Sequence, residues 1–429
     1  MSSTAIDRDY DVIDLSRSAL WSGPSEEREA LFAELRRDRP VSWQRPIRSS
    51  MMDLMGQTDP PGYWAVTRLA DIVTVSRTAD VFSSATGGVL LEEMPAEVLE
   101  AASSILAMDE PRHAKIRRIV SSVFTPRQIK RISGQIYNQA RQIVDDIASH
   151  EGDIEFVEAV SARLPMWTVS EMVGIPDDQR EEIAEAAAPL TAWDDESTSE
   201  TDALTTMFTG IMTLTMRCRE LIDVRRSHPT DDLISALVQA EVDGVSLTDD
   251  EISAFFVLMC VAGNDTTKQT TSHTIRSLTQ NPEQRSFLME DLDGRIDLAI
   301  EEFIRHATPV MTFRRTALKA FDLNGARIEP GDKVVMFYNS GNRDESAFDD
   351  PYTFDLARKP NAHVGFGGRG PHYCLGSHVA KLQLKAMFTE LLRRLPDIEA
   401  VGEADYLTST FINGIKRQQV RFTPEPAHN

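Results

Sequence analysis

The sequence is organised around one stretch near its end, Phe366-Gly-Gly-Arg-Gly-Pro-His-Tyr-Cys-Leu-Gly376. Its four glycines leave the backbone free to adopt positive φ angles and to approach a flat ligand closely. Cys374 stands just before the helical pattern of residues 377–394, so helix-terminal N–H groups and the helix dipole favour a thiolate there. Such a thiolate, packed against a planar macrocycle, is what an oxygen-activating haem requires. The alternative is a glycine-rich turn with a buried core cysteine.

A long helix is predicted between the capping box Thr248-Asp-Asp-Glu251 and the helix-ending pair Asn281-Pro282. Its centre, Ala262-Gly-Asn-Asp-Thr-Thr267, is polar although the preceding residues are apolar. Gly263 in a helix interior costs about 1 kcal/mol relative to alanine. A weak point at the centre of a buried helix indicates function. The alternative is a helix bend in which the hydroxyls bond back to the preceding turn.

Composition limits the class of protein. The 429 residues are 41% hydrophobic, and no linker or internal repeat divides them. Lys and Arg number 45 against 67 Asp and Glu, and the net charge of −22 argues against nucleic acid as a partner. Three distant cysteines, Cys218, Cys260 and Cys374, form neither a disulfide framework nor a zinc motif. The polar N-terminus has no apolar segment, so we expect a cytoplasmic protein without a membrane anchor.

The glycine-rich stretch resembles the cysteine-ligand loop of the cytochrome P450 family, whose pattern is Phe-Gly-x-Gly-x-(His/Arg)-x-Cys-x-Gly. Gly370, His372 and Gly376 stand at the expected distances from Cys374. Phe366 is one residue too far from the cysteine, so the loop carries an extra glycine. A similar longer loop occurs in actinobacterial members that hydroxylate steroid side chains and methyl-branched lipids. The centre of the long helix matches the family's (Ala/Gly)-Gly-x-(Asp/Glu)-Thr-(Thr/Ser) motif, and the resemblance covers nearly the whole chain.

The resemblance implies a mainly α-helical fold with small β-sheets, shaped like a triangular prism, with a long central helix over a haem. A single domain is expected to cover residues 1–429. Within it, residues 1–40 would form an N-terminal segment. A β-rich part would comprise about 41–85, 315–340 and 405–422, and helices would make up the haem-binding core.

The resemblance also assigns residues to the cofactor, haem b (iron protoporphyrin IX). Cys374 is the expected iron ligand, with Phe366 and Gly376 in its loop, and Gly263 would leave room for dioxygen beside the iron. Arg314 is an alternative to Arg315 as the arginine of the family pattern. The residues expected at the haem propionates are His113, Arg117, Arg315 and His372.

Two further groups follow from the resemblance. Thr266 would hydrogen-bond the oxygen ligand and an ordered water, while Asp265 would relay protons to it from the surface. Glu302, Arg305 and Arg358 would form a buried triad that serves folding and haem retention rather than a chemical step.

The substrate pocket is expected to be apolar. Its side chains favour a hydrophobic guest such as a steroid, a terpenoid or a branched lipid, although most of them could equally be core residues. Position in the family places around it Ala262, Val310, Met311, Phe313, Phe411 and Ile412.

Residues 111–131 are basic within an acidic chain, with seven Lys or Arg and no Asp or Glu. One interpretation is a solvated helix face. The other is a docking patch for an acidic ferredoxin, because local charge contrast steers encounter. That ferredoxin would deliver electrons that originate in NAD(P)H and pass through ferredoxin reductase.

The predicted function is that of a soluble, bacterial-type, monomeric haem-thiolate monooxygenase. It would insert one oxygen atom of O2 into a C–H bond of a hydrophobic small molecule. The alternatives are a tailoring oxidase of a polyketide or peptide natural product, a peroxide-driven enzyme, and a non-enzymatic haem-thiolate protein. The pair Asp265-Thr266 argues against the last two, because peroxide users generally lack it and a binding protein needs no proton relay.

Overall fold

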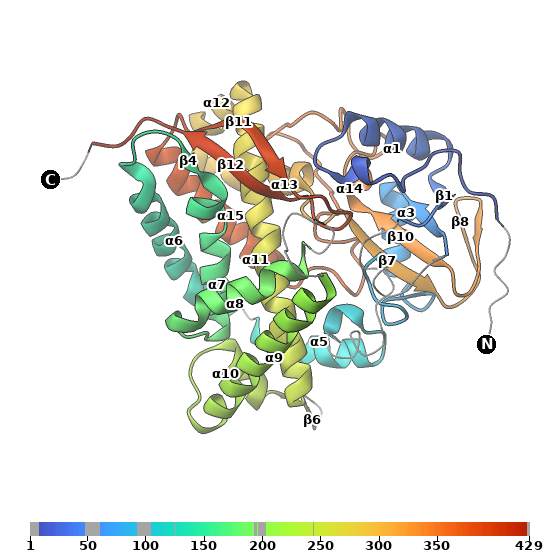
Figure 1. Cartoon of the computed structure of the whole chain (residues 1–429), viewed down its shortest axis with the longest axis horizontal. Coiled ribbons are helices and arrows are strands. Elements are labelled where there is room, and N and C mark those ends of the chain that lie inside the picture. Colours follow the sequence, from blue (N-terminus) through green and yellow to red (C-terminus); the bar gives the residue numbers. More distant parts are fainter. Residues whose placement is uncertain are drawn as a thin grey trace.

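The computed structural model describes residues 8–47, 61–91, 104–124, 126–192, 195, 203–242 and 244–426. Parts of the predicted N-terminal segment and β-rich part, residues 1–7 and 48–60, lie outside these ranges. Helices gather on one side of the molecule and a sheet on the other, with helix α11 running between them (Figure 1). The prediction of a mainly helical fold with small sheets is confirmed.

The central helix α11 (Asp249–Gln280) begins and ends where the sequence predicts. Its capping box is formed, because the Thr248 hydroxyl accepts a hydrogen bond from the Glu251 N–H and the Glu251 carboxylate accepts one from the Thr248 N–H. The helix stops at Asn281, directly before a proline. The helices in contact with it include α7 (Arg163–Val173), α8 (Arg180–Ala187), α9 (Ala203–Ser227), α13 (Leu292–Ala307) and α15 (Ser377–Arg394).

An apolar core beside α11 fixes the helix that follows the cysteine loop. Helix α15 packs against α6 (Pro126–Ala148) and α13, and the rings of Phe388 on α15 and Phe303 on α13 lie 5.0 Å apart. Ion pairs between α13 and α15 add to this contact, and they join Glu301 to Lys381, Asp297 to Lys385 and Asp293 to Arg393. The remaining α-helices of the described chain are α1 (Glu26–Asp38), α3 (Leu69–Arg77), α5 (Arg112–Val123), α10 (Leu233–Gln239), α12 (Pro282–Glu290) and α14 (Tyr338–Gly341).

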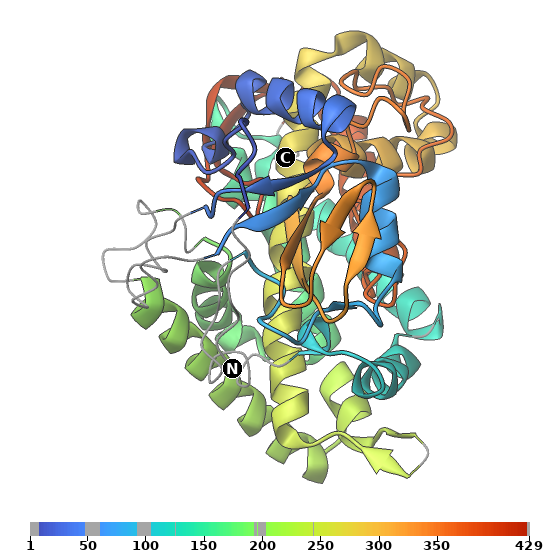
Figure 2. The ribbon, with the colours of Figure 1, turned by 90° about the vertical axis from the view of Figure 1, so that its right-hand side faces the viewer.

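A five-stranded sheet joins early and late parts of the chain, and Figure 2 shows its N-terminal strands beside the later ones. β10 (Lys333–Phe337) runs parallel to β2 (Tyr63–Val66) and antiparallel to β7 (Thr312–Ala317). Successive side chains of β10 face opposite sides, because Val335 joins the core with α1 while Val334 joins the core with α3. In spatial order the strands are β1 (Val41–Gln44), β2 (Tyr63–Val66), β10 (Lys333–Phe337), β7 (Thr312–Ala317) and β3 (Phe82–Ser83).

Residues 405–422 do not join this sheet, so that part of the predicted β-rich region is wrong. β11 (Glu399–Tyr406) and β12 (Ile415–Arg421) pair with β4 (Ile154–Glu155) in a separate three-stranded sheet. Because β4 leads into the helical part and β11 contacts α11, this sheet packs on the helices. Two short hairpins complete the described strands, β5 (Glu241–Val242) with β6 (Val245–Ser246) and β8 (Phe321–Leu323) with β9 (Ala326–Ile328).

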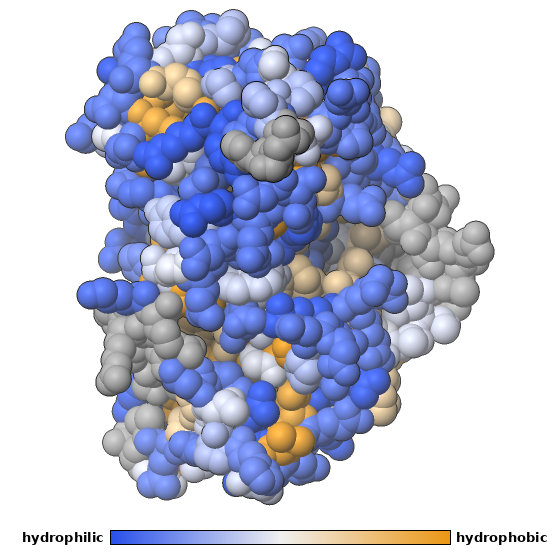
Figure 3. All heavy atoms as spheres, turned by 90° about the vertical axis from the view of Figure 1, so that its left-hand side faces the viewer, coloured by the Kyte–Doolittle hydropathy of each residue, from blue (hydrophilic) through white to orange (hydrophobic). Residues whose placement is uncertain are grey.

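The surface agrees with the acidic, polar composition. Figure 3 shows one face on which hydrophilic residues dominate and apolar atoms form only small groups. Among the described residues, every helix is too short or too polar to span a membrane.

Candidate active site

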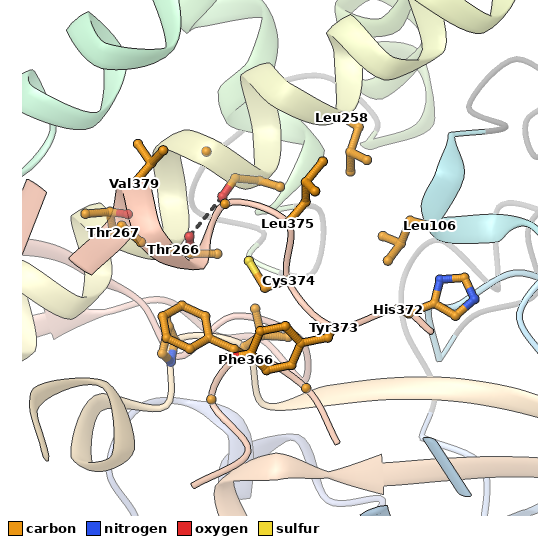
Figure 4. Close-up of a pocket in the computed structure, with 18 of the residues that line it drawn as sticks. Leu106, Leu258, Thr266, Thr267, Phe366, His372, Tyr373, Cys374, Leu375 and Val379 are labelled. Atoms are coloured by element: carbon orange, nitrogen blue, oxygen red, sulfur yellow. Dashed lines mark hydrogen bonds between the residues drawn. The ribbon is translucent and has the colours of Figure 1, made fainter. Parts of the chain in front are cut away.

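A cavity lies between the centre of α11 and the loop that precedes α15 (Figure 4). It brings together the two motifs that the sequence singled out, although they are far apart in the chain. The predicted site residues that line it are Arg117, Ala262, Gly263, Thr266, Val310, Phe313, Arg315, Phe366, His372, Cys374 and Gly376.

The cysteine loop closes on itself. The Cys374 N–H donates a hydrogen bond of 3.0 Å to the carbonyl oxygen of Phe366. The extra residue is accommodated at two left-handed backbone positions, Gly367 with φ of 96° and Arg369 with φ of 61°. Cys374 therefore keeps its predicted place directly before α15, whose first residue is Ser377.

The Cys374 side chain is exposed although protein surrounds it, because the surface that it exposes is the wall of the cavity. Burial raises the pKa of its thiol, while the N–H groups of Gly376 and Ser377 and the charge of Arg117 lower it. The N–H groups at the helix start thus lower the pKa of the thiol as the sequence predicts, but burial outweighs them and the net direction is upward. A metal cation bound to the sulfur would supply the missing stabilisation.

Basic side chains gather at one end of the cavity. Arg117 and Arg315 line it, and Arg117 also donates a hydrogen bond of 2.6 Å to the carbonyl of Tyr373. The rings of His113 and His372 lie 4.2 Å apart. Burial, together with Arg315, His113 and Arg117, lowers the pKa of His372 to about 3, so this imidazole is neutral.

One buried ring nitrogen near His372 has no hydrogen-bond partner among the described residues. His113 does not line the cavity, its Nδ1 lies 3.1 Å from the Glu110 carboxylate, and its Nε2 is buried without a hydrogen bond. Such an atom normally finds a partner in a native structure. Because Nδ1 faces a carboxylate, Nε2 carries a proton only in the doubly protonated ring, and in that form it could donate to a carboxylate of a ligand, as Arg117 and Arg315 of the cavity wall can.

The structure separates the two candidate arginines of β7. Neighbouring residues of a strand point to opposite faces. Arg315 lines the cavity, where burial lowers the pKa of its guanidinium. Arg314 packs toward the backbone of Gly87, which leaves no space for a β-carbon at that glycine. Arg315 is therefore the cavity arginine.

The centre of α11 presents its residues to two different sides. Thr266 lines the cavity, and its hydroxyl donates a hydrogen bond of 2.9 Å to the carbonyl oxygen of Ala262 (Figure 4). Asp265 is buried and does not line the cavity. Its carboxylate accepts a hydrogen bond from the Thr191 hydroxyl and forms an ion pair with Lys268. Thr266 therefore makes the hydroxyl-to-backbone hydrogen bond that the helix-bend alternative predicts, and it also lines the cavity.

Three of the six predicted pocket residues line the cavity: Ala262, Val310 and Phe313. Met311, Phe411 and Ile412 do not, so these predictions are wrong. Met311 points to the opposite side from Val310 and joins the core with α1.

The other two residues belong to the turn between β11 and β12. Ile412 pairs by its backbone with Val310 and is buried, and the ring of Phe411 packs against that of Phe313 in a tilted arrangement with centroids 5.6 Å apart. Both therefore support the residues of the pocket wall from behind.

Part of the apolar wall was missed although the sequence contained a signal for it. Phe255, Leu258 and Met259 line the cavity one or two turns before Ala262 on the same helix face, and helical periodicity finds them. Leu106 and Val169 come from other elements, and no local pattern marks them.

Glu302, Arg305 and Arg358 meet in the interior as the sequence predicts. The Glu302 carboxylate accepts two hydrogen bonds of 2.7 Å from Arg305, and Arg358 Nε lies 3.3 Å from it. Glu302 and Arg305 have no exposed side-chain surface. Asn361 and the Asp355 N–H also donate to the Glu302 carboxylate, so its acceptor positions are filled.

Nearly the whole chain is similar in sequence to monooxygenases of mycobacteria. A steroid C26-monooxygenase of Mycolicibacterium smegmatis is 36% identical over 430 aligned residues, which cover 99% of this chain and 96% of that protein. The sequence profile of cytochrome P450 matches residues 201–396. This chain belongs to the cytochrome P450 family. A methyl-branched lipid omega-hydroxylase of Mycobacterium tuberculosis, another P450 relative, is 37% identical over 417 residues, or 96% of this chain and 95% of that protein.

Solved P450 structures agree with this membership. A cytochrome P450 of Mycobacterium marinum in complex with pseudoionone has a TM-score of 0.92 and 50% identity, covering 97% of this chain and 100% of that one. A Bacillus megaterium cytochrome P450 in complex with corticosterone has a TM-score of 0.79 and 28% identity, covering 92% and 99%. The protein is a cytochrome P450 monooxygenase, with haem as its cofactor and O2 as its oxidant.

The residues of the cavity fit a haem. The Cys374 sulfur is accessible from the cavity, and Arg117 and Arg315 in its wall are donors of the kind that two propionates require. Apolar side chains line much of the remaining wall, as a porphyrin requires.

Proposed function

We propose that this cytochrome P450 hydroxylates a C–H bond of a hydrophobic small molecule, such as a steroid, a terpenoid or a branched lipid. The observation that carries the proposal is the apolar lining of the Cys374 cavity, to which Leu106 and Leu258 (Figure 4) and also Phe313 contribute. Relatives named for steroids and methyl-branched lipids, and the relative that binds pseudoionone, support this substrate class.

In the proposal, residues of this chain bind the haem and orient the substrate. When bound, the haem supplies the activation of O2 and the transfer of one oxygen atom to the substrate. Cys374 would bind the iron, and Arg117, Arg315, His113 and His372 would hold the propionates. The apolar wall would exclude water and orient the substrate.

Spectroscopy tests cofactor and substrate class together. The reduced protein with carbon monoxide is expected to show the long-wavelength Soret band of thiolate-ligated haem. Pseudoionone, corticosterone and a methyl-branched fatty acid would then be titrated separately into the oxidised protein. A shift of the haem spin state with at least one of them supports the proposal, because a bound guest displaces water from the iron. A normal carbon monoxide band without any such shift contradicts the substrate class alone.

Asp265 is proposed to move protons toward Thr266. Asp265→Asn is expected to slow pseudoionone hydroxylation by roughly 100-fold, the lower end of what a general acid contributes. Electrons taken from NADH would then leave as hydrogen peroxide, which a peroxidase assay measures. The matched control is Asp223→Asn, because Asp223 is an exposed acid on α9. Equal product yields per NADH in both variants would remove the proton role of Asp265.

The proposed electron donor is a ferredoxin that docks on the basic segment 111–131. Lys115 and Lys130 are exposed there, while Thr125 and the side chains of Arg127 and Arg131 lie outside the described residues.

The double variant Lys115→Glu and Lys130→Glu is expected to slow reduction by ferredoxin roughly tenfold at low salt, because it reverses the charge that steers encounter. Stopped-flow reduction at several salt concentrations measures this effect, and the difference should vanish at high salt. Lys319→Glu, at an exposed lysine between β7 and β8, is the control. Unchanged reduction rates in the double variant would contradict docking at this segment.

A further inference from the structure

The Asp265 carboxylate is held from two sides. One oxygen pairs with the ammonium of Lys268, which lies one turn later on α11 and exposes 19% of its side chain. The other oxygen accepts the hydrogen bond of the Thr191 hydroxyl, and Thr191 exposes 6% of its surface. One contact therefore draws the acid toward solvent, and the other holds it in the interior.

Thr191 does not belong to α11. It follows the 3-10 turn Ala188–Leu190 that continues α8, and its hydroxyl also lies 3.2 Å from the carbonyl of Ala188. Its contact with Asp265 spans 74 residues of sequence. The position of the acid thus depends on a segment outside the helix that carries it.

A second buried carboxylate holds this segment in place. Asp195, four residues after Thr191, exposes 5% of its surface. It accepts hydrogen bonds of 3.0 Å from the Thr408 N–H and from the Lys416 ammonium, which belong to the β11–β12 hairpin. Because the buried Asp195 carboxylate is costly to leave without its donors, the hairpin holds Asp195, whose N–H donates a hydrogen bond of 3.1 Å to the carbonyl of Ala192, the residue after Thr191.

We propose that Thr191 is a positioning residue for proton delivery, and that Asp195 and Lys416 hold it there. Its hydroxyl holds the Asp265 carboxylate in the interior, close to Thr266 and away from solvent. Without that hydroxyl, the carboxylate would follow Lys268 toward solvent, because a buried charge loses more when a donor is missing than an exposed one does. This inference rests on the proposed proton role of Asp265.

The decisive variant is Thr191→Val, which keeps the shape of the side chain and removes its donor. For the haem-loaded enzyme with pseudoionone, NADH, ferredoxin and ferredoxin reductase, kcat is expected to fall roughly tenfold, about the effect of one hydrogen bond to a charged group. KM should stay unchanged, and the ratio of rates in H2O and D2O should rise. Thr191→Ser should restore all three values, since serine keeps the hydroxyl.

Controls separate this role from a structural one. Thr209→Val changes an exposed threonine on α9, which is bonded only within its own helix at 2.8 Å to the carbonyl of Thr205, and should behave as the wild type. Lys416→Met should lower kcat in the same direction as Thr191→Val. A Thr191→Val enzyme with wild-type kcat and isotope ratio, or with a changed KM that serine does not restore, would overturn the proposal.

The rates of Asp265→Asn and Thr191→Val together show whether Thr191 lacks a positioning role or Asp265 lacks a proton role. If Asp265→Asn is slow while Thr191→Val is normal, only the positioning role of Thr191 falls. If Asp265→Asn itself is normal, the proton role on which the inference rests falls. A crystal structure of the Thr191→Val holoenzyme provides a measurement without substrate, and in it the Asp265 carboxylate should be turned toward Lys268 and solvent. An Asp265 side chain in its original orientation would overturn the proposal.

Discussion

Replacing Glu302 with alanine is expected to leave almost no folded, haem-loaded protein. Glu302 is fully buried and binds Arg305 through two hydrogen bonds of 2.7 Å. Removing the carboxylate leaves Arg305 and Arg358 as uncompensated charges in the interior, which costs about 3–5 kcal/mol. Since whole proteins are stable by only about 5–15 kcal/mol, this loss is a large part of the total.

The neighbouring residue provides a matched control for this prediction. Glu301 is also on α13, but its side chain is 29% exposed, and it pairs with the partly exposed Lys381 and with the buried His363. Glu301→Ala should therefore keep most of its haem, because exposed ion pairs contribute about 0–1 kcal/mol. Haem content per protein and the midpoint of thermal unfolding measure the difference. A haem-loaded Glu302→Ala protein that melts with the wild type would refute the structural role of the triad.

Replacing Cys374 with serine is expected to abolish both the thiolate spectrum and the hydroxylation of substrate. A serine hydroxyl is a weak iron ligand that would not push electron density toward bound oxygen as a thiolate does. The fold should survive, because the side chain faces the cavity rather than the packed core. The Soret band of the reduced protein with carbon monoxide and the rate of product formation report the two losses.

The other cysteines serve as controls for this experiment. Burial raises the pKa of Cys218 to about 12, and burial also raises the pKa of Cys260, so both remain thiols. Neither lines the cavity. Cys218→Ala should therefore retain the thiolate spectrum. A Cys374→Ser protein with an unchanged spectrum would mean that another residue binds the iron.

The ends of α11 and the shape of the Cys374 loop could be predicted from short sequence patterns. The capping box at Thr248 and the proline after Asn281 set both ends of α11, and the glycines of the Cys374 loop set its shape. The pocket side of β7 was only partly predictable. Whether Val310 or Met311 faces the cavity depends on the register of the strand against β10 and on which core covers each face.

The contacts that Thr191 and Asp195 make with distant segments could not be predicted from the sequence. No local pattern marks Thr191 or the acidic Asp195 as buried, yet both are buried and bonded to partners from α11 and the C-terminal hairpin. The state of the Cys374 thiol is a similar case, because the sequence shows the helix start that lowers its pKa but not the burial that raises it.

The five-stranded sheet combines strands from the beginning and from the last third of the chain, so it cannot be completed until late in synthesis. Trp64 on β2 donates a hydrogen bond of 2.9 Å to Asp332, which precedes β10 and lies 268 residues later. At roughly 5–20 residues per second, on the order of tens of seconds of synthesis separate the two. A two-stranded pair such as β1 and β2 is marginal on its own, and such non-local pairing slows folding. The nascent chain therefore carries an unpaired edge at β2 until β10 has been synthesised.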